Sequence, residues 1–204
     1  MSQPPMMPIP GTNAHNAMDR ASAWVTRFAP LIPDGEVMDL ACGAGRHSRL
    51  LAQHGHAVLA VDRNAEALAL AAGPGIQTMQ VDLETEDPAA SWPFAEARFA
   101  GIVVTNYLHR PLWGSLVASL ASNGMLIYET FALGNEQFGK PSNPAFLLAH
   151  GELLDVARQY GLQVVAYEDG YIAEPKPAMV QRICMIKADN QVDKGIPVTN
   201  LRLN

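Results

Sequence analysis

Residues 39–48 of the chain, DLACGAGRHS, place Gly43 and Gly45 directly behind a short apolar run. The run, EVMDLA, predicts a buried β-strand, and the residues after the glycines, RHSRLLAQHG, predict a helix that ends at Gly55. A glycine turn between a strand and a helix lets the backbone approach a ligand closely. The unpaired N–H groups at the start of that helix favour an anionic group. The stretch therefore predicts a ligand-binding loop at the beginning of an α/β fold.

Outward from this loop, strand and helix patterns alternate along the chain. An amphipathic helix is expected at residues 17–30, and strands are expected at HAVLAVD, IQTMQVD, FAGIVVTN and MLIYETF. Further helices are expected after Asn64, which can cap one, from Pro111 onward, and at GELLDVARQYG. The last two strands, LQVVAYED and AMVQRICMIKA, have no helix between them and should pair antiparallel. The pattern predicts a seven-stranded, mostly parallel sheet with helices on both faces.

The composition is that of one globular domain. The chain has 204 residues, of which 49% are apolar and 17% charged, and a net charge of -6. It lacks a Lys/Arg cluster for tracking a phosphate backbone, which disfavours a nucleic-acid partner. No apolar run reaches the ~20 residues of a membrane helix, and the proline-rich start is a poor signal peptide. We therefore expect a cytoplasmic protein without a membrane partner, made of a flexible N-terminal segment (1–16), one domain (17–188) and a C-terminal tail (189–204). Cys42 and Cys184 fall in no metal-binding spacing, so we expect both to be reduced and no metal to be bound.

Acidic residues end the next two strands. Asp62 closes the second strand, where a carboxylate can accept hydrogen bonds from both hydroxyls of a ribose. Asp82 closes the third, where it can accept from the amino group of an adenine while the N–H of Leu83 meets a ring nitrogen. Asp39 lies inside a hydrophobic strand, and we expect it to hold the loop amides or a ligand ammonium because an unpartnered buried carboxylate is costly. Each acid alone also fits an ordinary cap or turn. Ser48 stands where a dinucleotide loop would place its third glycine, so the series favours an adenosine with an amino-acid tail.

These motifs resemble those of the class I S-adenosylmethionine-dependent methyltransferases. The resemblance rests on VMDLACGAGRHSRLLA, VLAVDRN, VDLE, VVTNYL and the terminal antiparallel hairpin, and it covers about residues 35–188. Within that class the chain is similar to the small tellurite-resistance-type methyltransferase-domain proteins. The resemblance implies a Rossmann-like sheet of strand order 3-2-1-4-5-7-6 with an antiparallel last strand, the cofactor S-adenosyl-L-methionine and the product S-adenosyl-L-homocysteine. The cofactor-binding residues that it implies are Asp39, Ala41, Gly43, Gly45, Asp62, Arg63, Asp82, Leu83, Thr105 and Asn106.

The reaction implied by the resemblance is an in-line transfer of the methyl group to a small or medium-sized acceptor. Alignment of the reactants contributes up to ~7 to 11 kcal/mol in well-oriented systems, and a general base adds a smaller factor. The candidate catalytic residues are His109, because histidine is the side chain that most often acts as a general base, and Tyr107, which can stack on or orient a substrate. Both also fit ordinary loop or packing roles. Tyr107 follows Asn106 where methyltransferases acting on amino groups of adenine or glutamine carry N-P-P-Y, which disfavours such an acceptor.

Two other classes of function stay open. A nicotinamide-dependent oxidoreductase would share the ribose acid but should carry a third glycine at Ser48. A non-catalytic adenosyl-cofactor-binding protein would keep the loop but lack an acceptor pocket. The long loop at residues 132–145 is expected to cover the pocket, because mobile loops exclude water and complete sites. Glu129 and Arg46 are further candidates for substrate contacts, and the chain is expected to be a monomer or a homodimer.

Overall fold

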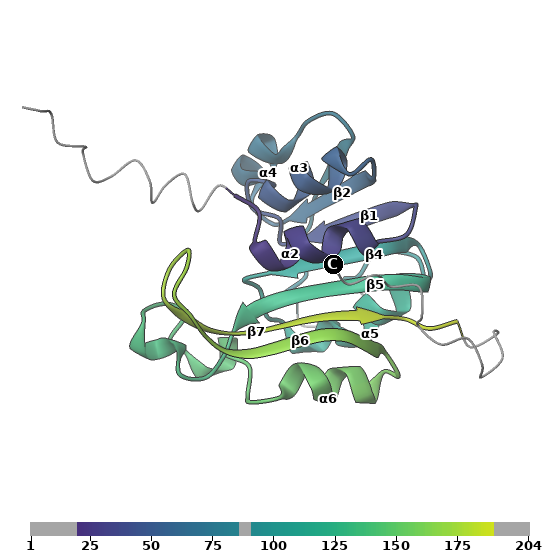
Figure 1. Ribbon diagram of the computed structural model, residues 1–204. Coiled ribbons are helices and arrows are strands. Elements are labelled where there is room, and N and C mark those ends of the chain that lie inside the picture. Colours follow the sequence, from purple (N-terminus) through teal and green to yellow (C-terminus); the bar gives the residue numbers. More distant parts are fainter. Residues whose placement is uncertain (1–19, 86–90, 190–204) are drawn as a thin grey trace, which may run out of the picture.

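The computed structural model describes residues 20–85 and 91–189 of the chain. Its strands are β1 Glu36–Leu40, β2 Ala57–Asp62, β3 Ile76–Gln80, β4 Phe99–Thr105, β5 Leu120–Phe131, β6 Gln163–Ile172 and β7 Ala178–Ile186. They form one seven-stranded sheet of order β3-β2-β1-β4-β5-β7-β6 (Figure 1). β7 runs antiparallel to β5 and β6, whereas the other neighbouring pairs are parallel. The predicted fold class, strand order and antiparallel last strand are confirmed.

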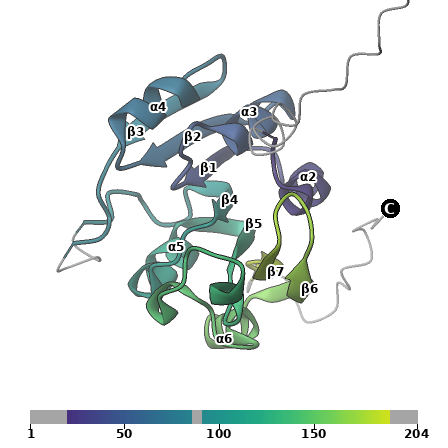
Figure 2. The same ribbon diagram turned by 90° about the vertical axis from the view of Figure 1, so that its left-hand side faces the viewer.

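Helices cover both faces of this sheet. α2 (Ala23–Phe28), α3 (Arg46–Gln53) and α4 (Ala65–Ala71) lie on one face, and α5 (Trp113–Ser119) and α6 (Glu152–Gln159) lie on the other (Figure 2). Side chains alternate between the two faces along each strand, so Val37 of β1 packs in the cluster that contains Trp24 of α2. The next residue, Met38, packs in the cluster that contains Leu116 of α5. With both faces covered, the carboxyl edge of the parallel strands is the place for a site.

The first described helix, α2, is shorter than the pattern at residues 17–30 predicts. It begins at Ala23 because the Ser22 hydroxyl accepts hydrogen bonds from the N–H groups of Trp24 (3.1 Å) and Val25 (3.4 Å). Residues 17–19 lie outside the described part of the chain. The helix ends in a 3-10 turn that contains Pro30.

The helix predicted from Pro111 onward is divided in two. A 3-10 turn, η2 (Arg110–Leu112), holds Pro111, and α5 follows it. The next strand begins at Leu120, ahead of the predicted start, because Leu120 already pairs with Phe99 before a bulge shifts the register. None of the helices in the described part of the chain has the length and apolarity of a membrane span.

The two segments predicted to be irregular contain neither an α-helix nor an extended strand in their described residues. The first, predicted at 83–97, covers 81–85 and 91–98 in the described residues and contributes Leu83 and Phe94 to the apolar cluster beneath α5 and α6. The second, predicted at 132–145, extends to residue 151 and contains the 3-10 turns η3 (Asn135–Gln137) and η4 (Pro144–Phe146). Its ends are joined, since Leu133 N donates to Leu148 O at 2.9 Å. Both segments are therefore held by packing or hydrogen bonds at defined points.

Candidate functional site

The glycine loop connects β1 to α3, and its two glycines differ in what surrounds them. Gly45 has φ +74°, and a Cβ at this position would lie 2.6 Å from the Cβ of Ala71 in α4. A Cβ at Gly43, which has φ +53°, would meet no atom within 4 Å. Gly45 is thus required by close helix packing, whereas Gly43 leaves open space for a ligand. Ala41 has φ +53° as well, a left-handed conformation that costs energy for a residue with a side chain.

Asp62, at the end of β2, anchors this loop. One carboxylate oxygen accepts from Gly43 N at 2.8 Å, and the other accepts from Asn64 N at 2.9 Å. Asn64 in turn caps α4 as predicted, through bonds from the N–H groups of Glu66 and Ala67. Each oxygen of Asp62 retains a second acceptor site, so the carboxylate can hold the loop and bind a hydroxyl group at the same time.

A pocket with a volume of about 160 Å³ lies at the carboxyl edge of the sheet. It brings together residues that follow or end β1, β2, β3 and β4, as expected for strands whose carboxyl ends meet at one edge. Of the predicted cofactor residues it contains five, and it also contains Tyr107, which the sequence analysis treats as a catalytic candidate. The lining residues are Leu40, Ala41, Val61, Asp62, Arg63, Val81, Asp82, Leu83, Glu84 and Tyr107.

Tyr107 reaches the far side of this pocket although it follows β4. Its backbone oxygen accepts a hydrogen bond from the buried Tyr128 hydroxyl at 2.7 Å, which fixes the turn. Burial, followed by the neighbouring carboxylate of Glu84, raises the pKa of the Tyr107 phenol above its usual range. The phenol therefore stays protonated at neutral pH, beside charged residues that follow β2 and β3, Arg63 and Glu84. Glu84 was missed by the sequence analysis, since an exposed acid in an irregular segment gives no signal.

Asp82 and Leu83 differ in burial. Asp82 is exposed, and its carboxylate accepts from Glu84 N at 3.0 Å. It therefore also has the ordinary turn-forming role that each of the acids alone would fit. Leu83 is 5% exposed and packs in the core while lining the pocket. Turn formation and pocket lining coexist at this strand end.

Asp39 is buried in β1, with an exposed fraction of 1%. Its Oδ2 accepts from the Ser48 hydroxyl at 2.5 Å, and its Oδ1 has no hydrogen-bond partner among the described residues. Burial raises the pKa of this carboxyl to about 6. The observed partner, a side-chain hydroxyl in the first turn of α3, is neither a loop amide nor a ligand ammonium, and a ligand on Oδ1 stays a prediction.

Thr105 and Asn106 lie at the end of β4. The Thr105 hydroxyl is 3.3 Å from His47 Nδ1, and both residues are buried. Asn106 is exposed, with φ +55°, and its N–H donates to Glu129 O at 2.9 Å. Neither residue lines the pocket, so this strand end forms the boundary between the pocket and β5.

His109 stands at the N-cap position of η2. Its Nε2 is buried without a hydrogen-bond partner among the described residues. His109 does not line the pocket, in contrast to Tyr107. The structure therefore separates the two candidate catalytic residues, placing one beside the pocket and the other beyond β4 near the 132–151 segment.

Three aromatic residues that do not line the pocket pack elsewhere. Trp113 packs in the core, and the Trp92 indole donates to the Ser119 hydroxyl at 2.9 Å. Phe138 is 37% exposed and contacts the Tyr171 ring, with ring centroids 5.3 Å apart.

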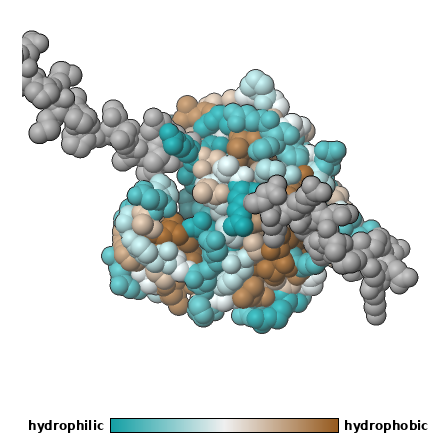
Figure 3. Space-filling model, viewed as in Figure 1, coloured by the Kyte–Doolittle hydropathy of each residue, from teal (hydrophilic) through white to brown (hydrophobic). Residues whose placement is uncertain are grey.

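On the face drawn in Figure 3, hydrophilic and hydrophobic residues are interspersed. The described residues also contain no group of three or more His, Cys, Asp or Glu side chains arranged to hold a metal ion.

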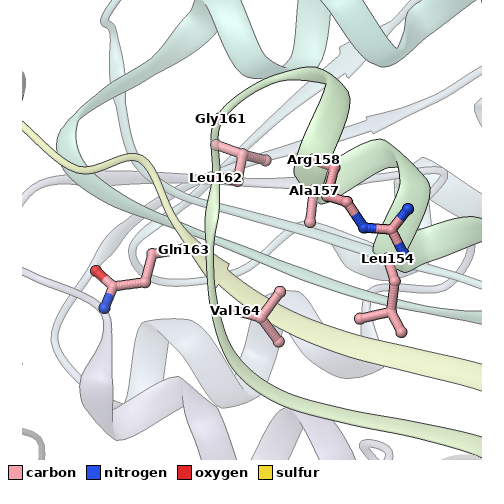
Figure 4. Close-up of a pocket in the computed structure, with 7 residues that line it drawn as sticks. All are labelled: Leu154, Ala157, Arg158, Gly161, Leu162, Gln163 and Val164. Carbon is pink, nitrogen blue, oxygen red and sulfur yellow. The ribbon is translucent and has the colours of Figure 1, made fainter.

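A larger cavity, of about 450 Å³, lies between the end of α6 and the start of β6 (Figure 4). Since β6 is parallel to β1 through β5, its first residues lie at the opposite edge of the sheet from the glycine loop. The lining is mostly apolar and contains none of the predicted site residues; it consists of Leu154, Ala157, Arg158, Gly161, Leu162, Gln163 and Val164. The smaller pocket, not this one, contains predicted cofactor residues.

Part of the chain matches known proteins in sequence. Residues 37–123 match the family model of the methyltransferase domain. Protein-L-isoaspartate O-methyltransferase from Chlorobaculum tepidum is 32% identical over 108 residues, which are 52% of this chain and 49% of that protein. The chain thus spans about half the length of the curated relative it matches. The region that matches the family model, residues 37–123, contains the glycine loop.

Solved structures with the same fold cover most of the chain. TehB from Haemophilus influenzae superposes with a TM-score of 0.65 at 19% identity, covering 82% of this chain and 62% of that one. An S-adenosylmethionine-dependent methyltransferase from Mesorhizobium loti gives a TM-score of 0.63 at 17% identity, covering 83% and 99% of the two chains. At these identities the likeness concerns the fold. Together with the family match over residues 37–123, it confirms the resemblance of the chain to the class I S-adenosylmethionine-dependent methyltransferases.

Proposed function

We propose that the protein transfers a methyl group from S-adenosylmethionine to a small or medium-sized acceptor. The observation that carries the proposal is the pocket at the carboxyl edge, where Asp62, Asp82 and Leu83 lie together beside the glycine loop. We further propose that the domain spans residues 17–188 and acts in the cytoplasm as a monomer or a homodimer.

The residues at this edge fit the cofactor on two observations. The buried Oδ1 of Asp39 has no partner among the described residues, which suits a ligand ammonium group. Gly43 leaves open space above the loop, which suits the methionine tail. In this arrangement Asp62 binds the ribose hydroxyls, and Asp82 with Leu83 faces the adenine. When bound, the cofactor supplies an electrophilic methyl group on a sulfonium.

The residues of the chain contribute mainly by holding and orienting the reactants. The left-handed turns at Ala41 and Asn106 fix the ends of β1 and β4 on either side of the reacting region. His109 is the candidate base, because its unpartnered Nε2 can accept a proton from an acceptor hydroxyl or amine. Tyr107 acts as a wall of the cofactor pocket in this proposal, since its phenol stays protonated and its ring lies among the adenosine-side residues.

The structure supports a dinucleotide less well. Ser48, at the position of the third glycine, is fully buried and donates its hydroxyl to Asp39. This side chain serves to orient an acid at the ligand site, and a pyrophosphate would meet that acid as a like charge. An oxidoreductase that uses a nicotinamide cofactor is therefore the weaker alternative.

The proposal is tested by calorimetric titration of the protein with S-adenosylhomocysteine, S-adenosylmethionine and NADH in parallel. We expect binding of the two adenosyl ligands and no binding of NADH. Binding of NADH alone would refute the proposed cofactor. Transfer of labelled methyl from the cofactor to components of a cell extract then separates an enzyme from a non-catalytic binding protein.

A further inference from the structure

Residues 20–22 cross the carboxyl edge of the sheet just before α2, and we call this segment the strap. It is tied to the start of α3 at two points: Arg46 Nη1 donates to Arg20 O at 3.4 Å, and Ser22 N donates to His47 Nε2 at 3.1 Å. It is tied to the end of β5 at a third point, where the Ser22 hydroxyl donates to Glu129 Oε2 at 2.9 Å. The strap therefore bridges the helix that follows the glycine loop and the strand next to β4.

His47 is the central residue of these contacts. Its exposed fraction is 1%, and its second ring nitrogen, Nδ1, lies 3.3 Å from the Thr105 hydroxyl. Since Nε2 accepts the Ser22 N–H, the neutral ring must carry its proton on Nδ1 and donate it to Thr105. Burial lowers the pKa of His47 to about 3, so the ring keeps this tautomer at neutral pH. One side chain thus holds the strap with one nitrogen and the end of β4 with the other.

The same helix turn faces the ligand site. Ser48, which follows His47, donates its hydroxyl to Asp39 Oδ2, while the buried Oδ1 of Asp39 has no partner among the described residues. A ligand ammonium on Oδ1 would fix Asp39, and through Ser48 it would fix the first turn of α3. That turn carries His47 and hence the strap.

We propose that His47 is a positioning residue that couples closure of the strap to occupancy of the cofactor site. This inference rests on the proposed function, because the cofactor is the ligand that fixes Asp39. Coupling between two sites is reciprocal. A cofactor that holds the turn of α3 stabilises the strap, and a closed strap slows the release of the cofactor and its product.

Two substitutions at one position separate the contacts of His47. In His47→Gln, the Oε1 atom can take the place of Nε2 and accept the Ser22 N–H, whereas the contact with Thr105 is lost. In His47→Asn, the shorter amide can donate to Thr105 from the place of Nδ1, whereas the contact with the strap is lost. Both variants are neutral and polar, so each serves as the control for the other.

The experiment measures hydrogen exchange of residues 20–28 and the rate at which bound S-adenosylhomocysteine is displaced by excess S-adenosylmethionine. In the wild-type protein, we expect bound S-adenosylhomocysteine to slow exchange of residues 20–28. In His47→Asn this slowing is lost, and release becomes about 3- to 10-fold faster, the factor expected for one neutral hydrogen bond. His47→Gln should retain the slowing and release the ligand within about 2-fold of the wild-type rate.

Four outcomes would overturn the inference. If S-adenosylhomocysteine binds but leaves exchange of the strap unchanged, or if both variants release it at the wild-type rate, the coupling is wrong while the proposed function stands. If His47→Gln loses as much of the slowing of hydrogen exchange as His47→Asn does, the hydrogen bond between His47 and Ser22 does not carry the coupling. If the wild-type protein binds neither adenosyl ligand, the proposed function fails and the coupling fails with it. Thermal unfolding of all three proteins shows whether each variant is folded under the conditions used.

Discussion

Asp62 shows how one residue at this edge combines a structural and a ligand-binding role. Its carboxylate accepts from the N–H groups of Gly43 and Asn64 and also lines the pocket. Substitution Asp62→Ala should weaken binding of S-adenosylhomocysteine by ~1 to 3 kcal/mol, the range for leaving a buried polar group unpaired. Calorimetric titration measures this change, and wild-type affinity in the variant would refute the ribose assignment.

Asn64→Ala is the matched control for this prediction. Asn64 caps α4 with its side chain but does not line the pocket. Loss of the cap should reduce the free energy of unfolding by about 1 kcal/mol. The affinity for S-adenosylhomocysteine should stay at the wild-type value, which separates a weaker helix from a lost ligand contact.

Asp39 should make the free energy of unfolding depend on pH. Its folded pKa of about 6 exceeds the unfolded value of 3.8, so the native state holds the proton more tightly. The stability from this group is fully present below about pH 3.8 and is lost as the pH rises through about 6. Between pH 4.5 and 7.5 the wild-type protein should lose roughly 2 kcal/mol relative to Asp39→Asn, which cannot ionise. Urea unfolding of both proteins at the two pH values provides the measurement, and parallel curves would contradict the prediction.

At the scale of elements, the 132–151 segment is held in place from both sides. Asn135, which is 2% exposed, accepts from Met179 N and donates to Pro141 O. Arg110 of η2 forms a two-pronged ion pair with Glu152 at 2.7 and 2.9 Å, and it donates to two backbone oxygens of the segment. The segment lines no part of the pocket. A covering role over the acceptor therefore stays a prediction, and any opening would have to occur between these anchor points.

Arg110→Ala should destabilise this segment. Removal of the guanidinium leaves Glu152 Oε1 and the backbone oxygens of Ala145 and Leu147 without the donors that Arg110 supplies, so we expect a loss of about 1 to 3 kcal/mol. Arg158→Ala is the control, since among the described residues its guanidinium pairs only with the exposed Asp155, and its loss should change stability by less than about 0.5 kcal/mol. Urea unfolding compares the two variants. Equal losses in the free energy of unfolding would show that Arg110 stabilises the segment no more than an exposed ion pair does.

At the scale of the whole molecule, the two cavities lie at opposite edges of the sheet, and only the smaller one should bind the cofactor. S-adenosylhomocysteine at a hundred times its dissociation constant should stabilise the fold by about 2.7 kcal/mol. For a domain of this size, that stabilisation raises the Tm by roughly 5 to 10 °C. Thermal unfolding with NADH at the same concentration should show no shift.

Val164→Lys, at the rim of the larger cavity, tests the location. Val164 is 39% exposed, so the substitution is tolerated at the surface. The variant should keep the full rise in Tm with S-adenosylhomocysteine. If the rise in Tm were lost, S-adenosylhomocysteine would bind at the larger cavity, which would contradict the proposed site.

Local patterns in the sequence are sufficient for most of the fold. Apolar periodicity, the cap at Asn64 and the terminal hairpin without a crossover helix are properties of neighbouring residues, and the structure confirms them. The errors occur where a more distant or more specific contact decides the boundary. The Ser22 hydroxyl sets the start of α2, and pairing of Leu120 with Phe99 starts β5 before the apolar run.

The sequence by itself determined the class of fold and the identity of the loop that approaches a ligand, because glycine turns, strand-ending acids and hydrophobic periodicity act within a few residues. Only the tertiary structure decided how those residues are used. It assigned Gly45 to helix packing and Gly43 to open space, and it placed Tyr107 on the wall of the pocket. It also joined Ser22 to His47 and Glu129, which are 25 and 107 residues away along the chain. Contacts at such separations form only when the parallel strands bring their carboxyl ends to one edge, and no pattern along the chain encodes them.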